Sequence, residues 1–228
     1  MNAKNPRVDL TNSAGAPRLR LRFLPAWALM AVTAAMVGGC QLLPPSAVDT
    51  TRFFVLTASM ATPAAPTAES KPDARLQIGL RQVELPAYLR ASKSMVVRDG
   101  ANEIRYQDYS RWAEPLDAGI NRVLMERLAV SSNVLGVDAH PLRGDLARNC
   151  YVAVRIVRCE GVAGENPVAR FSATYEITTP DGSRPALNKT YDAPDATWDG
   201  KDFNLLAKLL SDAVSALGDQ IAADLLKE

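Results

Sequence analysis

The segment FSATYEIT, residues 171–178, decides the fold class, because its apolar and polar residues alternate with a period of two. Such alternation is typical of a β-strand that buries one face and exposes the other. The apolar run YVAVRIV, residues 151–157, precedes it and predicts a second long strand. A turn signal follows at residues 180–182, and residues 187–191 are then expected to form a further strand.

The C-terminal stretch carries the strongest helical pattern in the chain. Its apolar residues recur at spacings of three and four, which predicts one long amphipathic helix with its apolar stripe on the sheet. A second helix is expected behind Pro115, which suits a first helical position. The apolar positions are Phe203, Leu206, Leu210, Val214, Leu217, Ile221 and Leu225 in the long helix and Leu116, Ile120, Val123, Leu124 and Leu128 in the other.

Shorter strands are expected before and between these elements. Asp99-Gly100 is a hairpin turn signal between two of them, because glycine accepts a positive φ. The expected segments are 52–57, 75–83, 94–98, 103–107 and 134–138. This order of elements predicts an α+β fold, a two-layer sandwich in which a mostly antiparallel or mixed sheet packs against two helices. The sheet edges and the other sheet face remain for solvent or a partner.

The N-terminal segment up to Cys40 has the features of a secretory signal. Three arginines, the last of them Arg22, lead into an apolar run at residues 23–37, and small residues precede the cysteine. VGGC, residues 37–40, resembles a bacterial lipobox, in which the cysteine becomes the lipid-bearing first residue of the mature protein. A transmembrane anchor is the weaker alternative, because the run has about fifteen residues and a span needs about twenty.

The chain is therefore predicted to have three parts. Residues 1–39 are the signal peptide, residues 40–51 a lipidated tether, and residues 52–228 a single domain, in which residues 58–74 form a flexible loop rich in alanine and proline. Without the signal, 189 residues remain, with a net charge of −3 against +1 for the whole chain. A mildly acidic domain lacks the basic surface that nucleic acid requires, so the acyl chains are expected to provide the membrane attachment.

No catalytic arrangement stands out in the sequence. His140 is the one histidine, and phosphate-binding glycine loops, a nucleophile elbow and paired metal-ligand spacings are absent. A strand between Cys150 and Cys159 would hold them about 30 Å apart, whereas a disulfide needs Cα atoms within about 7 Å, so two buried thiols are expected. We predict no enzyme, metal or cofactor beyond the acyl anchor; a thiol-dependent enzyme is the disfavoured alternative.

Residues 85–116 gather tyrosine, arginine and tryptophan, the residue types enriched at binding hot spots. Two alternatives stay open here: Trp112 packs over the sheet as a core residue, or Arg111 pairs with a carboxylate at the helix entry. The candidate partner-binding residues are Leu85, Pro86, Tyr88, Leu89, Tyr109, Arg111 and Trp112.

These motifs also carry a family resemblance. The connector LPAYL at residues 85–89, the hairpin after it, and the block RWAEPL at residues 111–116 before a helix resemble the PqiC-type lipoproteins. These are also called ABC-type transport auxiliary lipoproteins or membrane-integrity-associated transporter subunits. The strand FFVL at residues 53–56 resembles the opening of the family, and the likeness covers essentially the whole mature chain. The alanine- and proline-rich loop and the cysteine pair depart from the family pattern.

The resemblance implies a function that spacing cannot show. Such proteins sit on the periplasmic face of the outer membrane and act with an MCE-domain protein that spans the periplasm, and with inner-membrane components, to move lipid between membranes. Gln41, in place of aspartate after Cys40, favours sorting to the outer membrane by analogy. The expected function is a non-enzymatic subunit of such a system, and self-association into a ring stays open. The alternative is an envelope lipoprotein that regulates a cell-wall synthase.

Overall fold

The computed structural model describes residues 48–59, 75–181 and 187–226. The described residues from Asp49 onward form one compact unit. The expected signal peptide and Cys40 lie outside the described residues, as does most of the loop expected at 58–74. None of the described helices combines the length and apolar character of a membrane span.

The described residues form a mixed nine-stranded sheet, with both parallel and antiparallel neighbours. One path through it runs β1-β4-β3-β6-β2-β5, and β7 lies on the other side of β6 and carries β8 and β9 at its far edge. The strands are β1 Arg52–Phe54, β2 Leu76–Leu80, β3 Ser94–Asp99, β4 Glu103–Trp112, β5 Val134–Ala139, β6 Cys150–Val162, β7 Val168–Thr178, β8 Leu187–Asp192 and β9 Ala196–Thr197.

Strand β6 is the centre of this sheet. It pairs antiparallel with β7 along its whole length, while its other edge pairs in parallel with β2 at its start and with β3 at its end. Between those two strands the connector after β2 supplies the missing partners. The amide of Glu84 donates to Val154 O at 3.0 Å, and its carbonyl accepts from the amide of Ile156 at 2.9 Å. The edge of β6 is thus satisfied without a continuous neighbouring strand.

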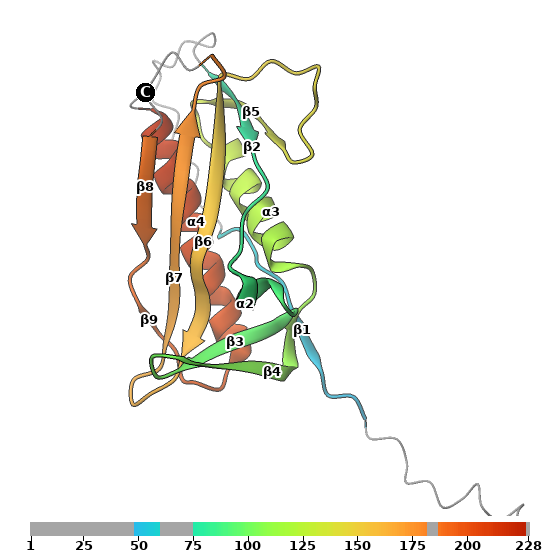
Figure 1. Ribbon diagram of the computed structural model, residues 1–228, viewed down its shortest axis with the longest axis vertical. Helices are drawn as coiled ribbons and strands as arrows, with labels where there is room; N and C mark the ends of the chain where they lie inside the picture. The colour runs from blue at the N-terminus through green and yellow to red at the C-terminus, as the bar shows by residue number, and fades with distance from the viewer. Residues whose placement is uncertain (1–47, 60–74, 182–186, 227–228) are drawn as a thin grey trace, which may run out of the picture. The chain divides into compact units, whose positions relative to one another are not determined.

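Two long helices, α3 Leu116–Ala129 and α4 Phe203–Leu225, lie together on one face of the sheet, and the short helix α2 Ala87–Arg90 lies beside β6 (Figure 1). Asp202 caps α4, because its side chain accepts from the amide of Asn204 at 2.9 Å. The core lies between helices and sheet, where Leu210 and Val214 of α4 are buried with Phe171 of β7.

Two glycines have identifiable tasks in this fold. Gly100 has a φ of 66° and turns the chain between β3 and β4, so the predicted hairpin is confirmed. Gly161 lets Trp198 approach β6, since a Cβ on this residue would lie only 2.7 Å from the indole ring. Trp198 is buried there, and its Nε1 donates to Asp202 O at 2.8 Å at the start of α4.

The predicted fold class is confirmed, while several boundaries differ. The strand expected at 52–57 ends at Phe54, because the chain then leaves the sheet for the helices: Arg122 of α3 donates to Leu56 O at 2.7 Å, and the amide of Thr57 donates to Ser211 Oγ of α4 at 3.1 Å. The strand expected at 75–83 stops at Leu80, and α2 begins within the connector expected at 85–89 and ends at Arg90. The short strand β9 was not predicted.

The two cysteines are free and buried, as expected, and both belong to β6. Burial raises the pKa of the Cys150 thiol to about 11 and that of Cys159 to about 12. Both therefore stay protonated near neutral pH, which makes them poor nucleophiles.

Candidate partner-binding surface

Among the residues that the structure describes, no long helix covers the face of the sheet opposite α3 and α4 (Figure 1). Alternation decides which side chains it carries. Along β7 the odd-numbered residues 169–177 are buried against the helices, so the even-numbered ones belong to this open face. Arg155 and Glu160 of β6 belong to the same face, because they pair with Thr174 and Arg170 of β7.

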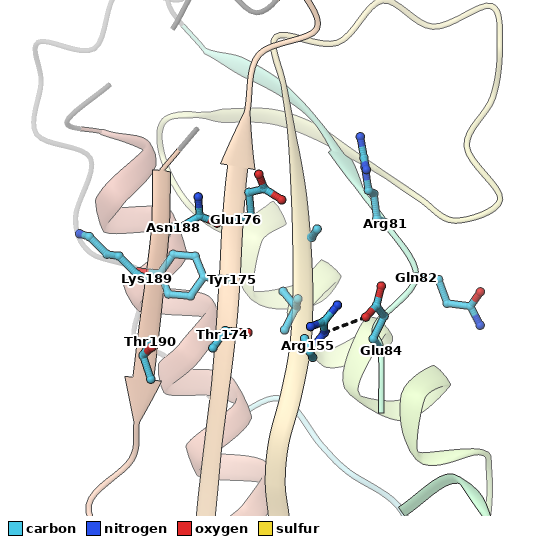
Figure 2. A pocket seen from close by; sticks show the side chains of 12 residues that line it. Arg81, Gln82, Glu84, Arg155, Thr174, Tyr175, Glu176, Asn188, Lys189 and Thr190 are labelled. Atoms are coloured by element: carbon cyan, nitrogen blue, oxygen red, sulfur yellow. Dashed lines mark hydrogen bonds and ion pairs between the residues drawn. The ribbon is translucent and has the colours of Figure 1, made fainter. Parts of the chain in front are cut away.

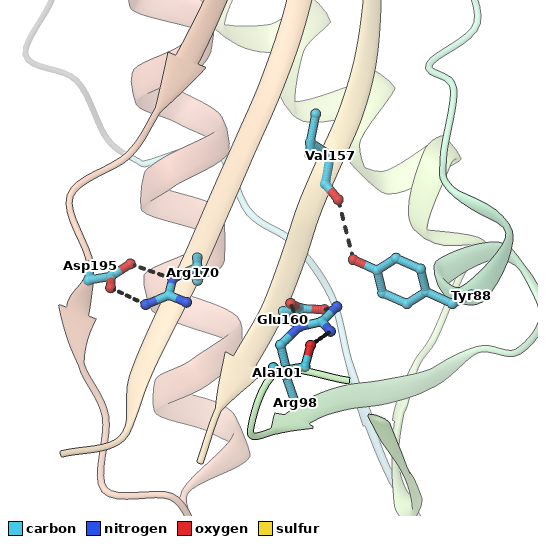
Figure 3. A network of polar contacts seen from close by, with 7 residues as sticks. All are labelled: Tyr88, Arg98, Ala101, Val157, Glu160, Arg170 and Asp195. Atoms are coloured by element: carbon cyan, nitrogen blue, oxygen red, sulfur yellow. Dashed lines mark hydrogen bonds and ion pairs between the residues drawn. The ribbon is translucent and has the colours of Figure 1, made fainter. Parts of the chain in front are cut away.

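One end of the open face is closed by α2 and the β3–β4 hairpin. There Glu160 is fully buried and pairs with Arg98, whose Nε lies 2.6 Å from Glu160 Oε1. The Arg98 guanidinium makes a second contact to Glu160 at 3.3 Å and also donates to Ala101 O (Figure 3). A buried carboxylate needs such a partner, because its desolvation would otherwise cost several kcal/mol (about 3–5 when one partner is removed).

Tyr88 of α2 lies over this ion pair. Its hydroxyl donates to Val157 O at 3.3 Å, and the Arg98 guanidinium carbon is 5.7 Å from the centre of its ring. Burial raises the pKa of Tyr88 to about 12, and the charge of Glu160 adds to the effect. Tyr106 of β4 donates to Tyr88 O at 3.0 Å, which ties the hairpin to α2.

A second ion pair lies across β7 from the first. Arg170 donates to both carboxylate oxygens of Asp195, at 3.0 and 2.5 Å (Figure 3). This bidentate bond lowers the pKa of Asp195 below its ordinary value. It joins the start of β7 to the segment between β8 and β9.

The other part of the open face is a shallow polar groove of about 500 Å³ over β6, β7 and β8. Thr174 and Glu176 of β7 lie beside Asn188 and Thr190 of β8, and the connector after β2 forms the opposite side (Figure 2). An exposed ion pair joins β6 to the connector at one side of the groove, with Glu84 Oε2 2.9 Å from the Nε of Arg155 (Figure 2). The groove therefore offers both charges and several hydrogen-bonding groups at its surface.

The structure sorts the seven predicted partner-binding residues by exposure. Leu89 and Trp112 are buried in the core, which confirms the alternative that Trp112 packs as a core residue. Leu85, Pro86 and Tyr88 are half-buried around α2. Tyr109, with 64% of its surface exposed, and Arg111 are left as surface groups on β4.

The helix entry is not held by Arg111 as the other alternative supposed. In the part of the chain that the structure describes, Arg122 makes this contact, since its Nη2 lies 2.6 Å from Glu114 Oε1. The same nitrogen donates to Leu56 O, so one arginine fixes both α3 and the segment after β1.

Sequence reasoning missed two groups of exposed residues. Phe53 and Val55 lie on the surface next to Arg111, although the period of two across residues 53–56 already separates them from the buried Phe54 and Leu56. The polar positions of β7 were predicted to form one side of a strand, and β8 was predicted only as a further strand; neither was predicted to form the floor of a groove. The groove depends on where the connector after β2 runs, and no local pattern reports that.

The described residues contain no group of three or more histidine, cysteine, aspartate or glutamate side chains that could hold a metal ion. The fold is thus an α+β domain, and its open sheet face presents a polar surface that another molecule can contact.

Comparison with known proteins identifies the family. The model of the ABC-type transport auxiliary lipoprotein component family matches residues 54–222, so the chain belongs to that family. It is an auxiliary lipoprotein of ABC-type transport. No curated protein sequence matches the chain.

Two crystal structures share the fold. A protein from Xanthomonas campestris is similar with a TM-score of 0.62 and 14% identity, over 75% of this chain and 93% of its own. A structure described as an uncharacterized protein is similar with a TM-score of 0.60 and 15% identity, over 77% of this chain and 98% of its own. At these identities the likeness shows the fold alone.

Proposed function

We propose that this protein is a non-enzymatic, lipid-anchored outer-membrane subunit of an MCE/ABC-type system that moves lipid between the two membranes. The observation that carries this proposal is the family match, which spans nearly the whole described domain. The domain contributes a binding surface in this role, and the partner proteins contribute the channel and the energy. The PqiC-type resemblance of residues 85–116 supports the choice of an MCE partner.

The anchor in this proposal is Cys40, acylated after removal of residues 1–39. Each buried CH₂ contributes about 0.8 kcal/mol, so one chain binds marginally and several hold firmly. An anchored domain searches only the layer next to the membrane. Confinement raises its effective concentration toward a partner that reaches the same layer, and weak contacts then suffice.

The partner-binding surface in this proposal is the polar groove together with the rim that α2 forms at the covered end of the same sheet face. The groove is exposed, carries both charges at Glu84 and Arg155, and has the exposed hydrogen-bonding side chains of Asn188 and Thr190 on β8. The half-buried Leu85, Pro86 and Tyr88 fix the position of that rim. Buried Leu89 and Trp112 act indirectly in the proposal, by holding α2 and β4 in place.

Photo-crosslinking in cells tests this surface. A photoreactive residue at Asn188, on the groove, is compared with one at Val130, which is 60% exposed beyond the end of α3. We expect Asn188 to capture an MCE-domain protein and Val130 not to. Capture of a cell-wall synthase at Asn188 would instead support the alternative function. Equal capture of the MCE-domain protein at both positions would overturn the groove as the binding surface.

A further inference from the structure

A second exposed surface lies on β1, β4 and the residue that follows β1. It consists of Phe53, Val55, Tyr109 and Arg111, which we call the β1–β4 patch. Phe53 is 62% exposed, Tyr109 64% and Val55 46%. These three side chains are large apolar or aromatic groups exposed to water, and they lie on β1, on β4 and on the residue after β1.

Strand register places the four side chains together. Phe53 pairs directly with Arg111 in the parallel β1–β4 ladder, so both point to the same side. Residues 53–56 alternate exposed and buried, and residues 109–112 do the same. Val55 therefore lies on the side of Phe53, and Tyr109 on the side of Arg111.

The buried neighbours hold the patch rigidly. Phe54, Leu56 and Trp112 all enter the core from the opposite side of the same two segments. The amide of Ala113 donates to Phe54 O at 2.8 Å just beyond the ladder. The exposed groups cannot turn inward without dragging these core residues out, so their exposure is a fixed property of the fold.

The chemistry of the patch matches a lipid headgroup layer. Aromatic rings with a polar edge or beside a cation concentrate at membrane–water interfaces, where the ring is dehydrated and the charge stays hydrated. Arginine can place its stem among apolar groups and its guanidinium among phosphates. Arg111 supplies the positive charge of the patch, whereas the Arg52 guanidinium lies on the other side of β1, 5.2 Å from the ring centre of Phe54.

The position of the patch in the chain points the same way. Phe53 follows Cys40 by 13 residues, a length that spans at most about 45 Å when fully extended. Strand β1, which carries Phe53, is thus the first strand of the described residues after the anchor. The far edge of the described sheet, β5, begins 94 residues after Cys40 and exposes a comparable apolar group, Leu135.

We infer that the β1–β4 patch rests on the lipid surface and orients the anchored domain, with Phe53 and Tyr109 in the headgroup layer. The inference relies on the proposed acylation of Cys40. The inference defines the orientation of the domain on the membrane. The sheet edge at β1 faces the membrane, and the polar groove remains accessible to a partner.

Environment-sensitive fluorescence tests this orientation in the full lipidated protein. The variants Phe53→Cys, Tyr109→Cys and Leu135→Cys are each labelled with an NBD dye and bound to phosphatidylethanolamine–phosphatidylglycerol vesicles. The buried native thiols of Cys150 and Cys159 should not react with the label. Leu135 is a matched control, since it is 60% exposed against 62% for Phe53.

We expect brominated phospholipid to quench the dye strongly at positions 53 and 109 and to leave it bright at position 135. Equal quenching at positions 53 and 135 in lipidated protein would overturn the orientation. A second result would also overturn it: blue-shifted dye emission at position 53 that brominated lipid does not quench and that increases with protein density on the vesicle. The patch would then bind a second copy of the protein. The mass of the N-terminal peptide is measured separately. An unmodified Cys40 would overturn the proposed anchor and therefore this inference. This mass measurement is independent of the fluorescence, so the two failures can be told apart.

Discussion

Two arginine–glutamate pairs lie on the same sheet face along β6, and their surroundings differ sharply. In the Arg98–Glu160 pair the side chains are 18% and 0% exposed, whereas in the Arg155–Glu84 pair they are 70% and 64% exposed. The nitrogen–oxygen distances are similar, at 2.6 and 2.9 Å. The same chemistry therefore does two things: the first pair is part of the folded interior, and the second belongs to the surface.

The two pairs differ in exposure because different parts of the chain cover the two carboxylates. Glu160 lies on β6 beneath Tyr88 and beside the β3–β4 hairpin, so water is excluded from it. Glu84 lies on an extended connector that satisfies its backbone against β6 and leaves its side chain in solvent. One end of the open face is thus built for stability, and the other end is available for binding.

The largest effect is expected from Glu160→Ala. Removing one partner of a buried ion pair leaves the other uncompensated, which costs about 3–5 kcal/mol. Urea unfolding of the wild type and variant measures this loss directly. The matched variant Glu84→Ala should lose less than about 1 kcal/mol, since exposed pairs contribute little. Similar losses in the two variants would show that coverage by α2 does not matter.

A local readout accompanies this prediction. Cys159 lies next to Glu160 and is buried with a raised thiol pKa. We expect Glu160→Ala to speed the labelling of Cys159 by a thiol reagent well before the domain unfolds globally, and Glu84→Ala to leave the rate unchanged.

An intermediate effect is expected from Asp195→Asn. The Arg170–Asp195 pair is 31% and 41% exposed and bidentate, so its loss should cost about 1 kcal/mol at neutral pH. Arg170 lowers the pKa of Asp195, so the wild-type contribution is present above the ordinary aspartate range and disappears as acid protonates the folded carboxylate. The difference in urea midpoint should therefore shrink toward low pH. A difference that is constant with pH would contradict the charge-based explanation.

These pairs also show how far sequence reasoning reaches. The alternation at residues 171–178 and the helical spacing of the C-terminus predicted the two layers, because each pattern repeats locally. The burial of Glu160 was not foreseen, since a glutamate at a strand position looks the same whether a tyrosine 72 residues away covers it or not. Trp112 could not be assigned to core or surface for the same reason. Its alternation with Tyr109 and Arg111 was visible, but the side that faced the core was not.

A smaller effect is expected from Tyr88→Phe, which removes one hydrogen bond at the covered end. At neutral pH the loss of unfolding free energy should be about 0.5–1 kcal/mol, as for a single neutral hydrogen bond.

The effect of Tyr88 should also depend on pH. Burial raises the pKa of Tyr88 from 10 to about 12, so between these values the unfolded tyrosine ionises while the folded one keeps its proton. Stability from this group is therefore complete below pH 10 and falls as pH rises toward 12. We expect the wild type to lose its advantage over Tyr88→Phe in that range. An advantage that grows with pH would reverse the sign of this argument.

The smallest effect on stability, and the sharpest on binding, is expected at the exposed end. Glu84→Gln should change the free energy of unfolding by less than about 0.5 kcal/mol, because both partners are well solvated. If the groove binds a partner, however, this substitution changes the charge that the partner meets, and capture by the photoreactive residue at Asn188 should fall. Glu103, an exposed glutamate on the hairpin outside the groove, provides the matched control as Glu103→Gln. Loss of capture in both variants would point to long-range charge. Loss of capture in Glu84→Gln alone would place the contact on the groove. There the sheet face is uncovered, so the exposed Glu84–Arg155 ion pair can exchange one partner for a group of the binding protein.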